Sequence, residues 1–284
     1  MTTTTAPSRQ DKVAAVHDQL LEQLEKLVTS DDWMAFLALA SRFHSYSSNN
    51  CMLIFAQRPD ATRVASYTTW KSLGRIVRKG EKGIAILAPC RYRVDEKDPA
   101  KSDEKASWRL KGFKVAYVFD VSQTEGASLE DDGIAVLLEG SAPMGMWTAI
   151  RTLIERDGYS VSRSDCGAAN GYTNRATNQV VVAPYLSDAA SAKTLVHELA
   201  HVRQTSDHDS AVSRALCEVE AESVAYIVCN AFGLSSAPYS IGYVAGWAGG
   251  DLDLVKTTAS WVVREAHRII KECEDQIEIT TAVA

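Results

Sequence analysis

The chain has 284 residues, of which 46% are hydrophobic and 23% charged, and its formal net charge is −6. This composition is typical of a globular protein with a substantial core, and the length suffices for two ordinary domains. No stretch approaches the ~18–20 consecutive apolar residues of a membrane span, and the polar N-terminus lacks the apolar centre of a signal peptide. Six scattered cysteines without a CxxC pair then predict reduced thiols in a cytoplasmic protein that does not enter a membrane.

The charge is distributed unevenly along the chain. Residues 1–126 carry 19 Lys and Arg against 15 Asp and Glu, whereas residues 127–284 carry 11 against 21. Between residues 42 and 93, ten basic residues accompany only two acidic ones. This pattern favours a module that faces a polyanion, joined to an acidic module. The alternative is an ordinary solvated surface whose acidic partners come from elsewhere in the fold.

The front half predicts helices followed by strands. Three segments show the apolar spacing of a helix: 8–29, 31–45 and 50–57. Two segments have the character of strands: 74–88, with a turn at 80–83, and 113–124. The charged stretch 94–107 predicts an exposed loop, and residues 1–8 predict a disordered lead-in.

A shift in composition across residues 127–145 predicts a linker between a first domain, 1–126, and a second domain, 146–284. The second domain shows helical spacing in four segments: 146–157, 188–204, 210–232 and 257–276. A predicted hairpin leads into the apolar run QVVVAP at 179–184. This run either lies at a sheet edge, where an extended peptide can add to it, or lies buried within a sheet.

The helix predicted over 188–204 contains the segment TLVHELAH, which has the HExxH spacing. Residues four apart share a helical face, so His197 and His201 can hold one Zn²⁺ ion through two imidazoles. Glu198 is then placed to act as a general base on water. The alternative is a pair of ordinary helix histidines without a metal.

A catalytic zinc site needs a third protein ligand, and the next predicted helix offers CEVEAESVA. Glu218 and Glu222 are four residues apart and share a face, whereas Glu220 points elsewhere. We favour Glu218 as the ligand and Glu222 as the group that orients a histidine, although the reverse assignment and a merely solvated acidic face stay open. Asp207 and His208 compete less well, because the pattern HExxHxxGxxH requires glycine where this chain has Gln204.

These motifs resemble the ArdC-type antirestriction proteins of mobile elements. The resemblance rests on FHSYSSNN (43–50), AQRPDATRVASYTTWKSLGRIVRKGEKGIAILAP (56–89), VFDVSQTEG (118–126), TLVHELAH (194–201) and EVEAESVA (218–225). It implies an α+β fold in which a single-stranded-DNA-binding domain precedes a mainly helical, zincin-like metallopeptidase domain with a small sheet. The back half also resembles the wider phage-regulatory metallopeptidases, whose E-x-x-A-[END] pattern implies Glu218 as the metal ligand.

The basic and aromatic residues of the front half have the character of a single-stranded-DNA site, in which cations contact phosphates and rings stack on bases. The candidates are Arg42, His44, Tyr46, Asn49, Asn50, Gln57, Arg58, Tyr67, Trp70, Arg75, Lys79 and Lys82. For Trp70, a place in the core is an equal alternative.

The leading interpretation is a mobile-element protein that binds single-stranded DNA and carries a metallopeptidase-like domain with one Zn²⁺ ion and a protein or peptide substrate. A second is a non-enzymatic DNA-protecting protein in which zinc is structural or vestigial. A third is a DNA-linked protease that cleaves a repressor. The sequence leaves the substrate, the DNA sequence preference and the oligomeric state open.

Overall fold

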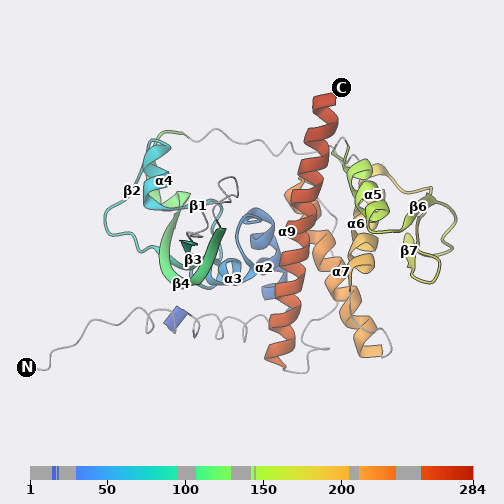
Figure 1. The fold of residues 1–284 in the computed structure, drawn as a ribbon, viewed down its shortest axis with the longest axis horizontal. Coiled ribbons are helices and arrows are strands. Elements are labelled where there is room, and N and C mark those ends of the chain that lie inside the picture. The colour runs from blue at the N-terminus through green and yellow to red at the C-terminus, as the bar shows by residue number, and fades with distance from the viewer. Residues whose placement is uncertain are drawn as a thin grey trace, which may run out of the picture. The chain divides into compact units, whose positions relative to one another are not determined.

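The computed structural model describes residues 15–16, 18, 30–94, 107–128, 142–143, 145–204, 211–234 and 251–283. Helices and small sheets form an α+β fold in two compact units (Figure 1). Unit 1 comprises Met1–Gln23 and Met52–Ser128, and unit 2 comprises Leu24–Cys51 and Leu129–Ala284. The predicted lead-in, nearly all of the predicted helix 8–29, the interior of the predicted loop 94–107 and most of the predicted linker lie outside the described residues.

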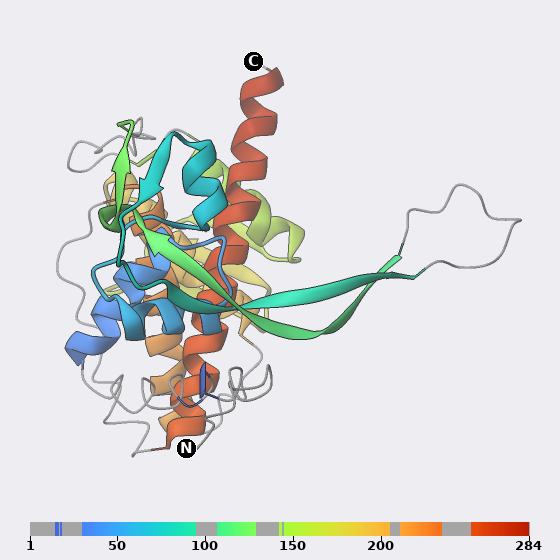
Figure 2. The same cartoon turned by 90° about the vertical axis from the view of Figure 1, so that its left-hand side faces the viewer.

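Unit 1 is dominated by a long antiparallel hairpin of β3 (Ile84–Val94) and β4 (Ser107–Asp120), shown in Figure 2. The register shifts between Cys90 and Arg91, whose partners are Gly112 and Leu110, so the bulge lies in β4, with Lys111 as the extra residue. The short strand β1 (Val64–Ala65) pairs with the far end of β4. The predicted strand 113–124 is therefore confirmed as an element, although the strand begins earlier and ends at Asp120.

The predicted pair of strands within 74–88 exists, but the two strands do not pair with each other. Strand β2 (Arg75–Val77) pairs with β5 (Thr124–Gly126), while β3 pairs with β4. Helix α4 (Tyr67–Ser72) precedes β2 and begins at Ser66, whose side chain accepts a hydrogen bond from the Thr69 amide. Its Trp70 is fully buried.

The end of β4 is fixed by the buried carboxylate of Asp120. This carboxylate accepts hydrogen bonds from the backbone amides of Thr62, Arg63 and Ser122 and from the Ser122 hydroxyl, at 2.6–3.0 Å. Burial raises the pKa of Asp120, but these hydrogen bonds outweigh that effect and hold the pKa below its ordinary value. The carboxylate thus joins the turn after β4 to the segment that leads into β1.

Unit 2 is built mainly from helices that pack around apolar side chains. They are α2 (Ser30–Arg42), α5 (Met146–Arg156), α6 (Asp188–Arg203), α7 (Ala211–Ala231) and α9 (Leu252–Val283), and all were expected from apolar spacing to within a few residues, except at the ends of α9. Helix α7 packs against α6, α2 and α9. No helix in the described parts of the chain has both the length and the apolar character needed to cross a membrane.

The small sheet of unit 2 has the order β6-β8-β7. Strand β8 (Gln179–Val182) is central, because it pairs in parallel with β6 (Ser160–Arg163) and antiparallel with β7 (Gly171–Asn174). The structure therefore decides between the two alternatives for QVVVAP. Its strand is mostly buried and paired on both sides, and β6 and β7 are the two edge strands.

Helix α2 belongs to the packing of unit 2. The indole nitrogen of Trp33 donates a hydrogen bond of 3.0 Å to the Ser223 hydroxyl on α7, and both side chains are fully buried. The sequence groups residues 30–51 with the front domain, whereas contacts place 24–51 in unit 2. Helix α3 (Ser48–Gln57) crosses the division between the units.

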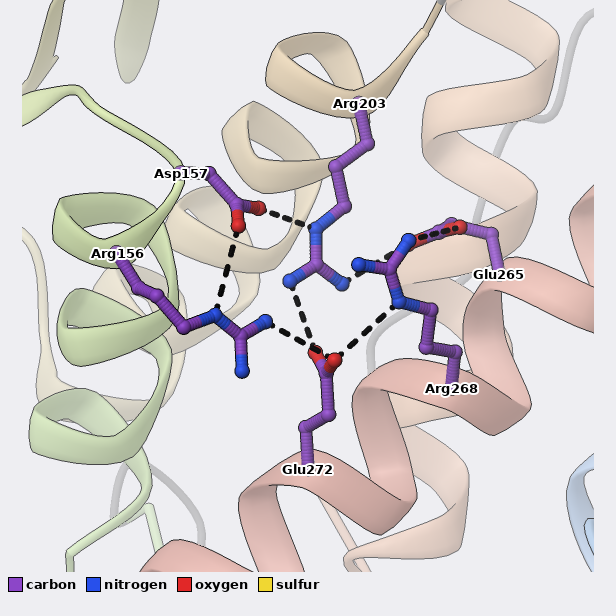
Figure 3. Close-up of polar contacts among 6 residues, drawn as sticks. All are labelled: Arg156, Asp157, Arg203, Glu265, Arg268 and Glu272. Atoms are coloured by element: carbon purple, nitrogen blue, oxygen red, sulfur yellow. Dashed lines mark hydrogen bonds and ion pairs between the residues drawn. The ribbon is translucent and has the colours of Figure 1, made fainter.

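The C-terminal ends of α5 and α6 are joined to α9 by a cluster of ion pairs (Figure 3). Arg203, at the end of α6, lies at its centre and contacts Asp157, Glu265 and Glu272. Because α6 also carries the HExxH segment, this cluster anchors the helix that presents the candidate site.

Candidate metal centre

The HExxH histidines lie on one face of α6 and point at each other. This helix begins at Ser187, whose hydroxyl accepts a hydrogen bond from the Ala190 amide. The His197 and His201 Nε2 atoms are 3.0 Å apart, and the side chains are 15% and 14% exposed. Two nearly buried ring nitrogens that face each other so closely are suited to share one cation.

Helix α7 brings Glu218 to the same point. Its two carboxylate oxygens lie 3.5 Å from His197 Nε2 and 3.5 Å from His201 Nε2. One ligand atom from each of the three residues lies within 4.8 Å of the others. The hydrogen bonds with both histidines hold the pKa of Glu218 well below its usual range. Two imidazoles and an ionised carboxylate form a donor set that fits a divalent metal ion.

Glu198 lies beside this triad and is only 4% exposed. Its Oε2 atom accepts a hydrogen bond of 2.7 Å from the Thr173 hydroxyl of β7. Burial raises the pKa of Glu198, while the Thr173 hydrogen bond and the two histidines oppose the rise. A carboxylate with a raised pKa, held in a fixed orientation, is suited to accept a proton near neutral pH.

A cavity of about 650 Å³ opens over the triad and Glu198. One wall consists of β7 and the following residue, and the other consists of α6 and α7. Glycine is required at the start of β7, since a Cβ on Gly171 would lie 2.7 Å from a Thr194 methyl carbon and 2.8 Å from the Val181 carbonyl oxygen. Gly171 thereby allows β7 to approach the metal helix closely.

Glu222 lies at the side of the His197 ring that faces away from His201 and Glu218. Its Oε1 atom is 3.6 Å from His197 Nδ1, and its Oε2 atom is 3.6 Å from the Lys193 ammonium. Glu218 faces the Nε2 atoms, where a shared cation would bind, whereas Glu222 faces the opposite ring nitrogen. The geometry favours Glu218 over Glu222 as the third ligand. The competing residues Asp207 and His208 lie outside the described residues.

The orienting partner of His201 is Gln204, a role that the sequence analysis did not predict. Gln204 Oε1 lies 2.9 Å from His201 Nδ1, and its Nε2 donates to the Cys217 carbonyl at 2.7 Å and to Glu220 Oε2 at 3.1 Å. Because the amide nitrogen faces two acceptors, the amide oxygen must face His201, which then carries its proton on Nδ1. This tautomer leaves the Nε2 lone pair free for a metal.

The expectation that Glu220 points away from the site is corrected by the same contacts. Glu220 is buried and supports Gln204, and burial raises its pKa to about 7. The helical spacing placed Glu220 on a different face from Glu218 and gave no sign that a side chain from α6 reaches that face.

We predict that Gln204→Leu weakens metal binding by about 10–100-fold, because an outer partner that fixes a ligand's tautomer commonly contributes that much. Competition with a chromophoric chelator measures the affinity, with the exposed Gln179→Leu as the matched control. Histidine ¹⁵N shifts of the metal-free protein add a second readout, since the variant should lose the Nδ1–H form of His201. A folded variant with unchanged affinity and tautomer would contradict this role.

The candidate DNA-binding residues are divided between the two units. Arg42, His44, Tyr46, Asn49 and Asn50 belong to unit 2, and the other seven belong to unit 1. In unit 2, the Tyr46 carbonyl contacts the His267 ring, and Asn50 is buried. The twelve candidates are therefore described separately for each unit.

In unit 1, the structure separates exposed candidates from structural ones. Trp70 lies in the core, and its indole nitrogen donates to the Phe119 carbonyl at 2.8 Å. Arg75 is bound to Thr124 and to the Ala127 carbonyl. The side-chain amide of Gln57 pairs with the backbone of Ala85: its nitrogen donates to the Ala85 carbonyl, and its oxygen accepts from the Ala85 amide. The exposed candidates are Tyr67, Lys79, Lys82 and, despite its hydrogen bonds, Gln57, while Arg58 is partly exposed.

Residues 10–119 match the family model of the N-terminal domain of anti-restriction factor ArdC. An uncharacterized protein of Bacillus anthracis is 25% identical over 317 aligned positions, which cover 94% of this chain and 53% of that protein. The chain thus spans about half the length of this curated relative.

Two solved structures of the antirestriction ArdC protein from the R388 plasmid are also similar. The Mn(II)-bound structure is 20% identical with a TM-score of 0.50, covering 80% of this chain and 84% of that chain. The metal-free structure is 22% identical with a TM-score of 0.48, covering 81% and 86%. The likeness to the Mn(II)-bound structure indicates a shared fold.

Proposed function

We propose that this chain is a cytoplasmic antirestriction protein of a mobile element, because its N-terminal domain makes it an ArdC-type protein. It binds single-stranded DNA through unit 1 and hydrolyses peptide bonds at a zinc site in unit 2. The observation that carries the enzymatic part is the convergence of His197, His201 and Glu218 within 4.8 Å. The buried carboxylate of Glu198 beside them supplies a base.

Zinc is the metal proposed for this site, because imidazole nitrogen and carboxylate oxygen are both ordinary zinc ligands. The R388 relative was solved with Mn(II), so manganese is the natural competitor. When bound, the ion supplies Lewis-acid activation of a water molecule and of the scissile carbonyl. His197, His201 and Glu218 would hold it, and Gln204 fixes the orientation of His201.

The residues of the chain supply the proton transfer and the positioning of the substrate. Glu198 accepts the proton of the attacking water and returns it to the leaving amine, while the Thr173 hydroxyl keeps Oε2 in place. Strand β7 is an edge strand of its sheet and lines the cavity, so an extended peptide can pair with it and lie across the triad. Of the two alternatives left open for 179–184, the buried strand is the one found, so 171–174 is proposed for this role instead.

Metal analysis of the purified wild type beside two single variants tests the site. We predict that Glu218→Ala loses most of its bound metal, whereas Glu222→Ala, removed from the Nε2 side, keeps at least half. Full metal content in Glu218→Ala would refute Glu218 as the ligand. Competition between Zn²⁺ and Mn²⁺ in the wild type decides which ion the site prefers.

The DNA-binding part is tested separately, by titrating the whole chain with single- and double-stranded oligonucleotides at two salt concentrations. Contacts with phosphates make affinity fall steeply with salt, and base stacking favours single strands. Binding without strand preference, or without dependence on salt, would refute this part of the proposal and leave the metal site untouched.

A further inference from the structure

One face of the β3–β4 hairpin in unit 1 carries exposed aromatic side chains. Side chains alternate between the two faces of a strand, so Phe113, Val115 and Tyr117 of β4 share one face. They pair with Pro89, Leu87 and Ala85 of β3. Phe113 is 48% and Tyr117 is 56% exposed. On the opposite face, Ile84, Ile86 and Val118 are buried. Leu87 shares the face of Phe113 and Tyr117 but is itself buried, so this face presents the two rings without being exposed along its whole length.

The Tyr117 ring is seated on glycine backbone. A Cβ on Gly83 would lie 2.9 Å from Tyr117 Cβ and 3.3 Å from Tyr117 Cδ1. Only glycine at position 83, directly before β3, lets the Tyr117 side chain lie this close to the backbone. Such a Cβ would also lie 3.1 Å from Phe119 Cζ, so Gly83 makes room for both side chains, and more than half of Tyr117 stays exposed, as a stacking platform requires.

A hollow of about 530 Å³ adjoins this platform, and Gly83 is common to both. Arg58 and the exposed Lys82 also line it. The Arg58 Nε atom is buried and has no hydrogen-bond acceptor among the described residues, since the nearest recorded carboxylate oxygen, on Asp60, is 3.7 Å away. Because the Nε atom itself has almost no accessible surface, a ligand would contact the part of the Arg58 side chain that stays exposed, which is 29% of it.

The charge of unit 1 selects an anionic ligand. Its described residues 52–94 and 107–128 include 12 Lys and Arg against four Asp and Glu. The one carboxylate that lines the hollow, Glu81, is already bound by Arg78 at 2.8 Å and by Gln123 at 3.0 Å. A basic hollow beside an open aromatic ring complements a nucleotide, which pairs a phosphate with a flat base.

We propose that one nucleotide of a single strand stacks its base on Tyr117 and places its phosphate in the hollow at Arg58 and Lys82. Phe113, four residues along β4 and so about 13 Å away, is a second platform for the same strand. This inference rests on the proposed binding of single-stranded DNA and locates its site. A duplex fits poorly, because its base faces are already stacked on one another.

The test is the fluorescence anisotropy of a labelled oligo-dT, titrated with the full chain. Tyr117→Leu should weaken binding by roughly 5–100-fold, the usual effect of losing one stacking ring. Tyr117→Phe keeps the ring and should stay within about twofold of wild type. Tyr185→Leu, which removes an exposed tyrosine of unit 2, is the matched control and should have no effect.

Arg58→Gln provides an independent readout. Removing one phosphate contact should lower the slope of log affinity against log salt by about one, while Tyr117→Leu should leave that slope unchanged. Far-ultraviolet circular dichroism and thermal melting establish that each variant is folded.

The failures are distinguishable. If the wild type does not bind oligo-dT, the proposed function itself fails. If the wild type binds and Tyr117→Leu binds equally well, the site is overturned and the function stands. Equal losses in Tyr117→Leu and Tyr117→Phe would overturn stacking as the reason. If Tyr117→Leu changes only self-association in light scattering, the face is a protein contact and the proposal is likewise overturned.

Discussion

A Glu198→Gln variant is expected to keep its bound metal and to lose peptide hydrolysis by about 10²–10⁴-fold, the usual contribution of a general base. The substitution preserves the size of the side chain and an oxygen that can accept the Thr173 hydrogen bond. It removes the ability of the Glu198 carboxylate to accept a proton, which is the role proposed for it besides the Thr173 hydrogen bond. Glu198 is not one of the three converging ligands, so metal content should stay at the wild-type level.

The measurement is the cleavage of a quenched fluorescent peptide library, with metal content determined on the same samples. Glu155→Gln is the control, because Glu155 is an exposed residue of α5 that pairs only with Arg151 within its own helix. Undiminished cleavage in Glu198→Gln would exclude Glu198 as the base. If protection of DNA from restriction survives this substitution with the metal still bound, hydrolysis is not the function, and the non-enzymatic interpretation prevails.

The part of the site that the sequence could predict is the part that depends on one helix at a time. The i, i+4 spacing of His197 and His201 needs only a helix to place both rings on one face. Glu218 and Glu222 were candidates because they share one face of the apolar-flanked helix that follows, and the resemblance to the E-x-x-A-[END] pattern favoured Glu218. Both inferences use local periodicity, which is the strongest signal in a single sequence.

The supporting contacts were not predictable in the same way, because each depends on how two elements meet. Gln204 reaches His201 on its own helix and Glu220 on the next one, and no spacing rule links residues 204 and 220. Thr173 comes from β7, whose place beside Glu198 depends on the close approach at Gly171. Such contacts follow from tertiary packing.

In the front half, the sequence could not predict the direction in which the side chains of the strands face. The run FKVAYVFD is apolar at nearly every position, so alternation does not reveal which face of β4 is exposed. Phe113 and Tyr117 were therefore overlooked, while Trp70, the most conspicuous aromatic residue, proves to be buried. A basic charge count predicts a module that faces a polyanion but does not indicate which side chains form the stacking surface that we propose.

Replacing Arg203 with methionine is expected to lower the free energy of unfolding of unit 2 by about 3–5 kcal/mol, as is usual when one partner of a buried ion pair is removed. The Arg203 side chain is 5% exposed and donates to Asp157 Oδ2 at 2.6 Å, Glu265 Oε1 at 2.9 Å and Glu272 Oε2 at 2.8 Å (Figure 3). These carboxylates lie on α9 and at the end of α5. Without the guanidinium, the buried Glu265 loses its closest cation.

Arg268→Met is the matched control from the same cluster. Arg268 contacts Glu272 at 3.2 Å and Glu265 at 3.7 Å, but its side chain is 51% exposed. An exposed ion pair contributes only about 0–1 kcal/mol, so this variant should unfold close to the wild type. Urea denaturation followed by circular dichroism measures both. Equal midpoints for Arg203→Met and wild type would show that the cluster does not stabilise the fold.

The pH dependence of the Arg203→Met deficit separates lost ion pairing from lost packing. Burial raises the pKa of Glu272, but Arg203 and Arg156 outweigh this and hold the pKa below its ordinary value. A lowered folded-state pKa gives stability that is present above the unfolded-state pKa and is lost as the pH falls through the folded-state pKa. The gap between wild type and Arg203→Met should therefore be largest near neutral pH and narrow on acidification. A gap that is constant with pH would assign the deficit to packing of the arginine stem. Because Arg203 ends the helix that carries His197 and His201, the same titration shows whether the metal centre depends on an ion cluster outside it.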